Sequence, residues 1–494
     1  MKIKLLALFS LVFVFLFACS NPSSSGGGPE LSYTGKTLCA GTEGVAYSQD
    51  LATATGADGI NYLLASGSLP QGLSLSQAGL LSGTPVDITT NAAFSVLASA
   101  EGLSATADFT VTIKPVPGTG TPSTDWYDAG DSYIISNPDD LAGLEFLVRT
   151  ITDFNGKTIK LAANLDMSAY GQAFNGGKGW RPIGNWDEHF KGEFDGNNKA
   201  IIGLYFNDDS FTSPGGLFGY IEGGIIKDLG MKDVDITSDS IIGGLAGQIG
   251  ASKISNCYVT GAVSGGTFYN GGLVGSIFNG EISNCYVTGA VSGKSEVGGL
   301  VGHIENGEIS NCYATGAVSG IYEVGGLVGS IDNSEISNCY ATGAVSCEDA
   351  DVGGLVGNIL GGAISNCYAT GAVSGKSDVG GLVGYIRDSN IRFCAALNPG
   401  LTRKAESTET SFCRVAGNVV GDSLGANVAF AGMMPPDDII FDDKFLYGHD
   451  GADISKAQIT GEIFGYFTAA GGWTTGSGVL PGFGQTVALP GHLR

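Results

Sequence analysis

Four carboxylates that lie close together in the sequence have the most obvious potential for catalysis. They are Asp187, Glu188, Glu193 and Asp195, with Arg181 and His189 nearby. Two carboxylates held a short distance apart can act as the acid and the base of glycoside hydrolysis. A charged rim of exposed turns has the same composition without any chemistry, and we favour that interpretation. A polysaccharide lyase or hydrolase therefore stays as an alternative function.

Other catalytic and metal-binding signatures are absent from the sequence. None of the four histidines belongs to a His-Glu-x-x-His motif, which would place two zinc ligands on one face of a helix. The sequence also lacks a framed Gly-x-Ser-x-Gly nucleophile elbow, a phosphate loop ending in Gly-Lys-Ser/Thr and the calcium-binding nonapeptide array. We therefore expect a protein that is not an enzyme and has no catalytic residue, metal or cofactor.

Cysteines recur at a regular spacing. The motif Ile-Ser-Asn-Cys-Tyr-(Val/Ala)-Thr-Gly-Ala-Val-Ser carries Cys257, Cys285, Cys312, Cys339 and Cys367, and it degenerates at Cys394. Stacked repeats would align these thiols with parallel Cβ vectors, which is poor geometry for a disulfide. We expect buried, mostly reduced thiols, with metal binding as the less favoured alternative. Cys347 and Cys413, outside the column, could pair with each other, and Cys39 is expected to be a buried free thiol.

A tyrosine follows each of the first five of these cysteines. The column consists of Tyr258, Tyr286, Tyr313, Tyr340 and Tyr368. Stacked tyrosines can stabilise a repeat fold, or they can display a flat aromatic strip to a sugar or a protein. We favour the structural role, and the five tyrosines are the candidate ligand-facing residues.

The elements that would position these columns come from a repeat of about 27 residues. The motif Gly-Gly-Leu-(Val/Ala)-Gly begins at Gly243, Gly271, Gly298, Gly325, Gly353 and Gly380, with a Phe variant at Gly215. Each unit holds short strand-type stretches broken by glycine, and none is long enough for an amphipathic helix. Such a unit suits one coil of a parallel β-helix, in which coils pair about 4.8 Å apart.

The periodic positions also predict which side chains point inward. They are the Leu and Val of Gly-Gly-Leu-Val-Gly, the Ile and Cys of Ile-Ser-Asn-Cys, and the Ala two positions after the Cys. The sequence varies most between repeats, as in 266–270, 294–296, 321–323 and 348–351. We expect these segments to be exposed turns, where a partner could be recognised without disturbing the fold. The carboxylates among them vary too much from coil to coil to nominate a catalytic pair.

The repeat closely resembles the GLUG repeat of bacterial surface and adhesin-like proteins. The resemblance extends from about Trp126 to Cys394, because Trp180-Arg-Pro-Ile-Gly and Phe190-Lys-Gly-Glu-Phe-Asp-Gly are similar to the segment that leads such arrays. It implies a right-handed parallel β-helix and a role at the cell surface, often in adhesion, without assigning catalytic residues. Some GLUG-bearing proteins are zinc peptidases, but the peptidase motif is absent here.

Residues 31–114 are expected to form a separate all-β sandwich. Leu69-Pro-Gln-Gly-Leu-Ser-Leu and Gly79-Leu-Leu-Ser-Gly-Thr-Pro resemble the signature of Ig-like modules of bacterial surface proteins. The prolines lie where strands end, because proline cannot donate to a strand ladder, and the glycines allow tight reversals. The resemblance implies a spacer or a weak binding module. Residues 115–124 form a Pro/Gly/Thr linker.

The N-terminus has the layout of a lipoprotein signal. Residues 1–18 contain two lysines and then an apolar run that is too short to span a bilayer. Leu16-Phe-Ala-Cys19 resembles a lipobox, which makes Cys19 the lipidation site, and 19–30 a flexible tether. We expect a membrane partner through this lipid anchor, and a location at the outer membrane or cell surface.

Composition excludes one class of partner. The 494 residues carry a net charge of −24, so nucleic acid phosphates would repel the chain.

Together the signals predict an all-β protein with a β-helix at 125–394, regular repeats at about 215–394, and irregular final coils with a cap at 395–494. The expected function is non-catalytic adhesion to a glycan or protein ligand. A passive envelope spacer and a carbohydrate-active enzyme are the alternatives.

Overall fold

The computed structural model describes residues 30–210, 212–404, 411–421, 423–459, 467, 473–475, 479–482 and 486–493. The expected signal peptide and Cys19 lie outside these residues. The chain divides into two compact units, the first built mainly from residues before 113 and the second mainly from 113 onwards. Within the described residues, no helix is both long and apolar enough to cross a bilayer.

The N-terminal unit is a small β-sandwich, as predicted. Its sheets have the strand orders β1-β7-β6-β3 and β2-β5-β4. The strands are β1 (Gly41–Thr42), β2 (Tyr47–Asp50), β3 (Asn61–Gly67), β4 (Leu73–Leu75), β5 (Leu80–Gly83), β6 (Thr89–Ala100) and β7 (Leu103–Lys114). Phe94 and Phe109 stack in its core with centroids 5.9 Å apart. The prediction that Cys39 is buried is wrong: Leu38 points inward, so its extended neighbour points outward and is exposed.

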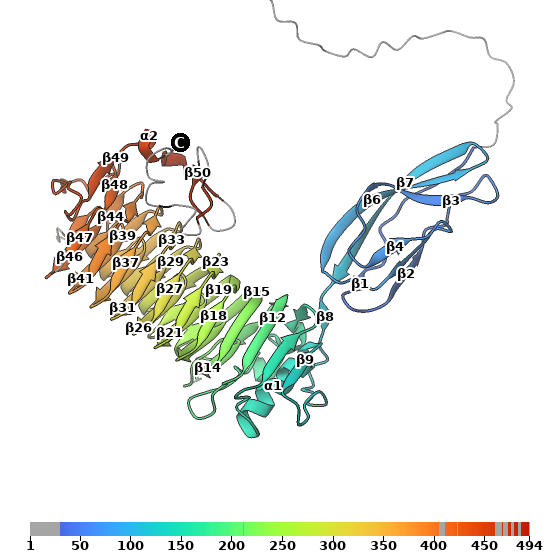
Figure 1. The fold of residues 1–494 in the computed structure, drawn as a ribbon, viewed down its shortest axis with the longest axis horizontal. Helices are drawn as coiled ribbons and strands as arrows, with labels where there is room; N and C mark the ends of the chain where they lie inside the picture. The colour runs from blue at the N-terminus through green and yellow to red at the C-terminus, as the bar shows by residue number, and fades with distance from the viewer. Residues whose placement is uncertain are drawn as a thin grey trace, which may run out of the picture. The chain divides into compact units, whose positions relative to one another are not determined.

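The second unit is a β-solenoid of about 11 turns that runs from residue 132 to 454 (Figure 1). Neighbouring coils pair in parallel and in register, so that Ile254, Ile282 and Ile309 occupy one column. One sheet contains β14 (Phe218–Glu222), β17 (Ala246–Gly250), β21 (Val274–Phe278), β26 (Val301–Glu305), β31 (Val328–Asp332), β36 (Val356–Leu360), β41 (Val383–Arg387) and β46 (Ala416–Val420). A second contains β16 (Ile242–Gly243), β20 (Asn270–Gly271), β25 (Ser295–Gly298), β30 (Tyr322–Gly325), β35 (Ala350–Gly353), β40 (Ser377–Gly380) and β45 (Phe412–Cys413).

The remaining face consists of three adjoining strips of short strands. The first has β18 (Lys253–Ser255), β22 (Glu281–Ser283), β27 (Glu308–Ser310), β32 (Glu335–Ser337), β37 (Ala363–Ser365), β42 (Asn390–Arg392) and β47 (Ser423–Gly425). The second has β19 (Tyr258–Gly265), β23 (Tyr286–Val287), β28 (Tyr313–Ala314), β33 (Tyr340–Ala341), β38 (Tyr368–Ala369), β43 (Ala395–Ala396), β48 (Val428–Phe430) and β49 (Ala452–Ile454). The third has β24 (Ala290–Ser292), β29 (Val318–Gly320), β34 (Val345–Cys347), β39 (Val373–Gly375) and β44 (Leu401–Arg403).

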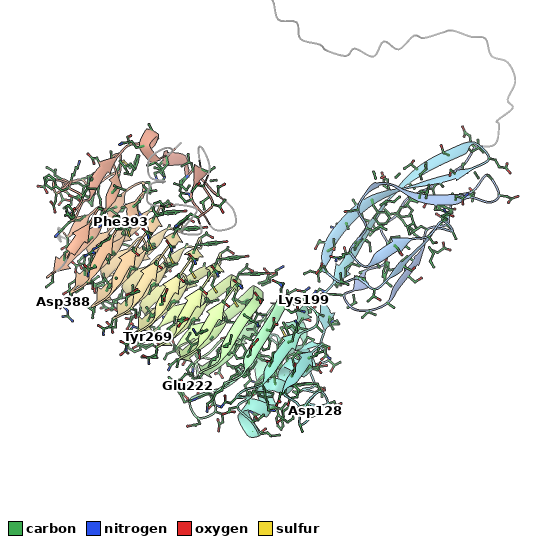
Figure 2. The ribbon with its side chains drawn as sticks, in the orientation of Figure 1. Asp128, Lys199, Glu222, Tyr269, Asp388 and Phe393 are labelled. Carbon is green, nitrogen blue, oxygen red and sulfur yellow. The ribbon has the colours of Figure 1, made fainter. Side chains whose placement is uncertain are left out.

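The corners of the coils explain why the repeat is strict. Asn284 and Asn311 have φ values of 54°, a left-handed conformation that asparagine tolerates better than most residues. Other corners have the same conformation, including Tyr269 and Asp388, which are labelled along the solenoid in Figure 2. At Gly271 a Cβ would lie 1.8 Å from the carbonyl oxygen of Val274, so only glycine fits. The expected inward columns are confirmed, because the repeated Leu, Val, Ile and Cys side chains are buried in one core.

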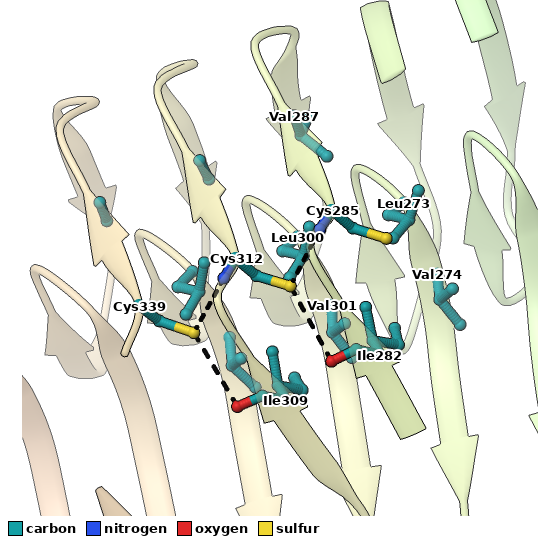
Figure 3. Close-up of a cluster of buried hydrophobic side chains, with 14 of the residues drawn as sticks. Leu273, Val274, Ile282, Cys285, Val287, Leu300, Val301, Ile309, Cys312 and Cys339 are labelled. Carbon is teal, nitrogen blue, oxygen red and sulfur yellow. Dashed lines mark hydrogen bonds between the residues drawn. The ribbon is translucent and has the colours of Figure 1, made fainter. Parts of the chain in front are cut away.

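The cysteine column forms a continuous ladder inside the solenoid (Figure 3). The backbone N–H of Cys285 donates to Cys312 Sγ at 3.3 Å, and that of Cys312 donates to Cys339 Sγ at 3.4 Å. The thiols are buried and unpaired, as predicted. Cys347 and Cys413 are unpaired as well. The column of Cys413 reaches the coil of Cys347 only after two coil steps, about 10 Å, which is beyond the reach of a disulfide.

The first coils contain a helix that was not predicted from the sequence. This region consists of β8 (Val116–Pro117), β9 (Ser132–Ile135), α1 (Pro138–Thr150), β10 (Thr158–Leu161), β11 (Leu165–Asp166), η1 (Met167–Tyr170), η2 (Asn175–Gly177), β12 (Glu193–Ile202), β13 (Tyr205–Asn207) and β15 (Ile225–Ser238). The Asn137 side chain accepts from the N–H of Asp140 at 3.0 Å, and Pro138 opens the first turn. Leu141, Leu144 and Leu147 of α1 join the solenoid core.

The C-terminal region continues the coils and then turns back over one face. β43, β48 and β49 pair in succession, so the solenoid persists to residue 454 although the sequence repeat has faded. Beyond it lie α2 (Lys456–Ile459), β50 (Val479–Leu480), β51 (Val487–Ala488) and η5 (Gly491–Leu493). Described residues of this region pack against the side of the solenoid. For example, His492 Nε2 lies 2.8 Å from the carbonyl oxygen of Leu397.

Candidate functional site: the tyrosine ladder

The five tyrosines of the repeat form one outward-facing column, here called the tyrosine ladder. Each follows an inward-pointing cysteine, and successive side chains on an extended chain point to opposite sides, so each tyrosine points outward. Neighbouring coils align the residues directly, from Tyr258 to Tyr286 and on to Tyr313, Tyr340 and Tyr368. Ring centroids are 5.0, 4.9, 4.7 and 5.0 Å apart in that order, and the ring planes differ by 1° to 6°.

This stacking determines which part of each ring reaches solvent. The centroid spacing matches the rise of one coil, so each ring covers the face of the next. The faces are therefore used within the ladder, and the rims with their hydroxyl groups are directed outward. Tyr258 ends the ladder over Gly230, where a Cβ would lie 2.5 Å from the Tyr258 hydroxyl oxygen. Lys232 Nζ lies 6.0 Å from the centre of the Tyr258 ring.

The C-terminal region covers the other end of the ladder. The Trp473 ring lies 6.2 Å from Tyr340 and 5.9 Å from Tyr368, measured between centroids. Phe467 meets Tyr368 at 5.7 Å with an interplanar angle of 81°. The Tyr368 hydroxyl donates a 2.6 Å hydrogen bond to the carbonyl oxygen of Pro481.

This cover corrects part of the sequence prediction. Tyr340 and Tyr368 are 2% and 0% exposed, so they do not face a ligand in this structure. Tyr258, Tyr286 and Tyr313 remain partly exposed, and we call these three residues the open strip. Nothing in the sequence pattern distinguishes the two groups, because all five tyrosines lie in the same motif.

An asparagine column borders the ladder. Trp473 Nε1 donates to Asn338 Oδ1 at 3.4 Å, two residues before Tyr340. The equivalent oxygen one coil earlier, Asn311 Oδ1, is shielded from solvent and has no hydrogen-bond partner among the described residues. A shielded acceptor without a partner is costly, and it favours a donor at this position.

The phenols of Tyr286 and Tyr313 are neutral donors at neutral pH. Burial raises the pKa of Tyr313 to about 12, with a smaller contribution from Tyr286. Burial likewise raises the pKa of Tyr286. Each of these hydroxyls can therefore donate a hydrogen bond to a ligand, as Tyr368 does to Pro481.

The carboxylates considered for catalysis fall into two groups. Glu193 pairs with Lys227 at 2.6 Å and Asp195 with Lys160 at 3.6 Å, both on strands of adjacent coils. Asp187 and Glu188 instead line an open depression of about 540 Å³ with His189.

A second carboxylate group was missed in the sequence. Glu296, Glu323, Asp351 and Asp378 each precede the Val-Gly of their coil, and register places them in one column. His303 Nδ1 lies 2.9 Å from Glu296 Oε2. Burial, followed by the charges of Asp378 and Glu323, raises the pKa of Asp351 to about 7.

In the part of the chain that the structure describes, no group of three or more His, Cys, Asp or Glu side chains is arranged to hold a metal ion.

Comparison with family models agrees with both resemblances. Residues 31–114 match the family described as "Putative Ig domain". The segments 238–264, 266–292, 293–319, 320–346 and 350–374 match the family described as "The GLUG motif". The solenoid repeat is a GLUG repeat. The tyrosine ladder therefore lies within five successive GLUG repeats.

Two curated relatives are similar in sequence to part of this chain. "Halomucin" of Haloquadratum walsbyi is 35% identical over 130 residues, which are 26% of this chain and 1% of halomucin. "Putative Gly-rich membrane protein" of Evansella cellulosilytica is 35% identical over 99 residues, which are 19% of this chain and 11% of that protein. The chain thus spans only a small fraction of the length of either relative.

Solved structures with a similar arrangement include two with protease titles. One is titled "putative immunoglobulin A1 protease" from Bacteroides ovatus, with 20% identity, a TM-score of 0.42, and coverage of 75% of this chain and 98% of that one. The other is titled "IgA1 Protease", with 16% identity, a TM-score of 0.40, and coverage of 68% and 28%. At these scores the likeness carries no argument about activity.

Proposed function

We propose that this chain is a non-catalytic cell-surface protein, attached to the membrane through a lipid on Cys19, whose solenoid binds an external ligand. The observation that carries the proposal is the open strip. Three tyrosine rims lie partly exposed on a parallel scaffold, next to two that contact the C-terminal Trp473. Aromatic groups with a polar tip are suited to interfaces, because they combine apolar area with a hydrogen-bonding group.

The surface location is supported by several independent features. The lipobox-like Leu16-Phe-Ala-Cys19 follows an apolar segment, and a low-complexity tether separates it from the first folded unit. The names of the relatives, one a halomucin and one a membrane protein, are consistent with export. A net charge of −24 keeps an exported chain soluble.

The non-catalytic part of the proposal rests on the carboxylates. Glu193 and Asp195 each contact a lysine of an adjacent coil, which favours a structural role for both carboxylates. The depression lined by Asp187 and Glu188 is also lined by Lys191 and Arg149, and it is open to solvent.

A binding screen with product analysis tests the proposal. Residues 20–494 without the lipid are applied to a glycan array and to extracellular-matrix proteins, together with Tyr286→Ser. Tyr322→Ser serves as the matched control, since Tyr322 is 48% exposed and lies outside the ladder. We expect saturable binding that Tyr286→Ser weakens at least tenfold and Tyr322→Ser leaves unchanged.

The other outcomes point to the alternatives. Absence of binding to either class of ligand would favour a passive envelope spacer. Release of a cleaved glycan, abolished by Asp195→Asn or Glu193→Gln, would establish a carbohydrate-active enzyme and overturn the non-catalytic assignment.

A further inference from the structure

We propose that the open strip recognises a polypeptide segment that carries a tryptophan. The inference rests on the proposed binding function and narrows its ligand class. It follows from three features of the ladder: the orientation of the rings, the residue that occupies the adjacent coils, and an unsatisfied acceptor.

Ring orientation disfavours a sugar as the principal ligand. Sugars stack on the faces of aromatic rings, but the faces of Tyr286 and Tyr313 are covered by their neighbours at 4.7 to 5.0 Å. The ladder offers ring rims, which carry the positive part of the aromatic quadrupole. A positive rim attracts the negative face of another aromatic ring, so an aromatic side chain is the complementary partner.

The chain's own C-terminal region supplies aromatic side chains of this kind to the tyrosines next to the open strip. Phe467 makes an edge contact with Tyr368, and Trp473 lies across Tyr340 and Tyr368. Because the coils repeat, the neighbouring coils offer the same surface with Tyr313 in place of Tyr340. A second aromatic segment could therefore lie next to the first in the same manner.

Hydrogen bonding selects tryptophan over phenylalanine. The indole N–H of Trp473 donates to Asn338 Oδ1, and the corresponding Asn311 Oδ1 has no partner among the described residues. This oxygen is shielded from solvent, so a ligand indole reaches it when the Asn311 side chain turns outward. Phenylalanine has no donor for this oxygen, whereas an indole does. The neutral hydroxyls of Tyr286 and Tyr313 can donate to backbone carbonyls of the ligand, as Tyr368 donates to Pro481. The coil of Tyr313 thus combines an aromatic rim, a phenol donor and an amide acceptor.

A peptide-binding experiment tests this inference. The probe is a fluorescein-labelled synthetic peptide with the sequence of residues 467–482, which contains Phe467, Trp473 and Pro481. Its fluorescence anisotropy is titrated with residues 20–494. Asn311→Gly removes the acceptor while keeping the left-handed corner, which glycine adopts freely. Asn366→Gly is the matched control, since Asn366 has the same conformation in a coil outside the open strip.

The expected pattern is specific to the open strip. Asn311→Gly should weaken peptide binding about five- to tenfold, the loss typical of one hydrogen bond, and Asn366→Gly should not. A probe with phenylalanine at the position of Trp473 should bind about five- to tenfold more weakly to the wild type. It should show no further loss with Asn311→Gly, because both changes remove the same interaction. Circular dichroism of the variants checks that the solenoid is intact.

Several results would overturn the inference. One is the absence of peptide binding at millimolar concentration, and another is equal affinity for the wild type and Asn311→Gly. A third is binding that Tyr368→Leu weakens and Asn311→Gly does not, which would mean that the probe only displaces the chain's own segment. If the glycan and matrix screen nevertheless detects binding that depends on Tyr286, the proposed function stands and the tryptophan assignment alone fails.

Discussion

Replacing Asp351 with asparagine should make the solenoid more stable at pH 8 and leave it almost unchanged at pH 4. Asp351 lies in the carboxylate column, partly buried between Glu323 of the preceding coil and Asp378 of the next. Its carboxyl group is hydrogen-bonded to that of Asp378, and Asp349 adds further negative charge. The nearby Lys376 is paired with Asp349, at 3.7 Å.

The sign and size of the effect follow from the pKa of Asp351. Burial and the neighbouring carboxylates raise it from 3.8 to about 7. The folded protein therefore binds this proton more tightly than the unfolded chain, and the resulting stability is fully present below about pH 3.8 and lost as the pH rises through about 7. At about 1.4 kcal/mol per pKa unit, the loss is at most about 4 kcal/mol. The side chain is partly exposed, so we expect about 1–3 kcal/mol.

Urea unfolding of residues 20–494 at pH 4 and pH 8 measures this difference. The introduced asparagine side chain cannot ionise, so the Asp351→Asn variant should gain about 1–3 kcal/mol over the wild type at pH 8 only. Asp388→Asn is the matched control, because Asp388 is an exposed corner residue with a positive φ as well. A stability difference for Asp351→Asn that is the same at both pH values, or that Asp388→Asn reproduces, would refute the reasoning.

Three further predictions concern the solenoid and its cysteines. Ile309→Ala should destabilise the solenoid by about 2–5 kcal/mol in urea unfolding, because Ile309 is fully buried in an inward column, and a loss below about 1 kcal/mol would contradict that packing. Gly298→Ala should destabilise it by at least about 2 kcal/mol, since the new Cβ would lie 1.9 Å from the carbonyl oxygen of Val301, whereas Gly203→Ala, with no atom within 4 Å, should cost less. In native residues 20–494, a thiol reagent should react quickly with the exposed Cys39, and Cys39→Ser should remove this fast phase. The ladder cysteines should react only after unfolding, because burial keeps the reagent away from them.

The features predicted correctly are those that depend on contacts between equivalent residues of neighbouring repeats. When each coil pairs with an identical one, a side chain that points inward in one coil must point inward in all, or the register fails. The buried Leu, Ile and Cys columns and the stacked tyrosines follow directly from this constraint. The sandwich at 31–114 was likewise recognisable from its turn residues.

Some errors had signals that could have been used. The start of α1 is marked by Asn137-Pro138-Asp139-Asp140, which is a helix N-terminus pattern, although the strand-like segments on both sides favour an all-β interpretation. The variable segments containing Glu296, Glu323 and Asp351 were expected to be exposed turns. Neighbouring coils bury these three residues in part, because stacking at about 4.8 Å leaves little room between their corners.

The sequence by itself determined the coil, its register, the inward columns and the outward position of the tyrosines, because all of these depend on contacts between equivalent residues one repeat apart. Only the tertiary structure decided which tyrosines are available to a ligand. That depends on Phe467, Trp473 and Pro481 folding back across Tyr340 and Tyr368, a contact between residues more than 90 positions apart. The repeat pattern cannot predict such a contact, because the contacting segment lies outside the repeats.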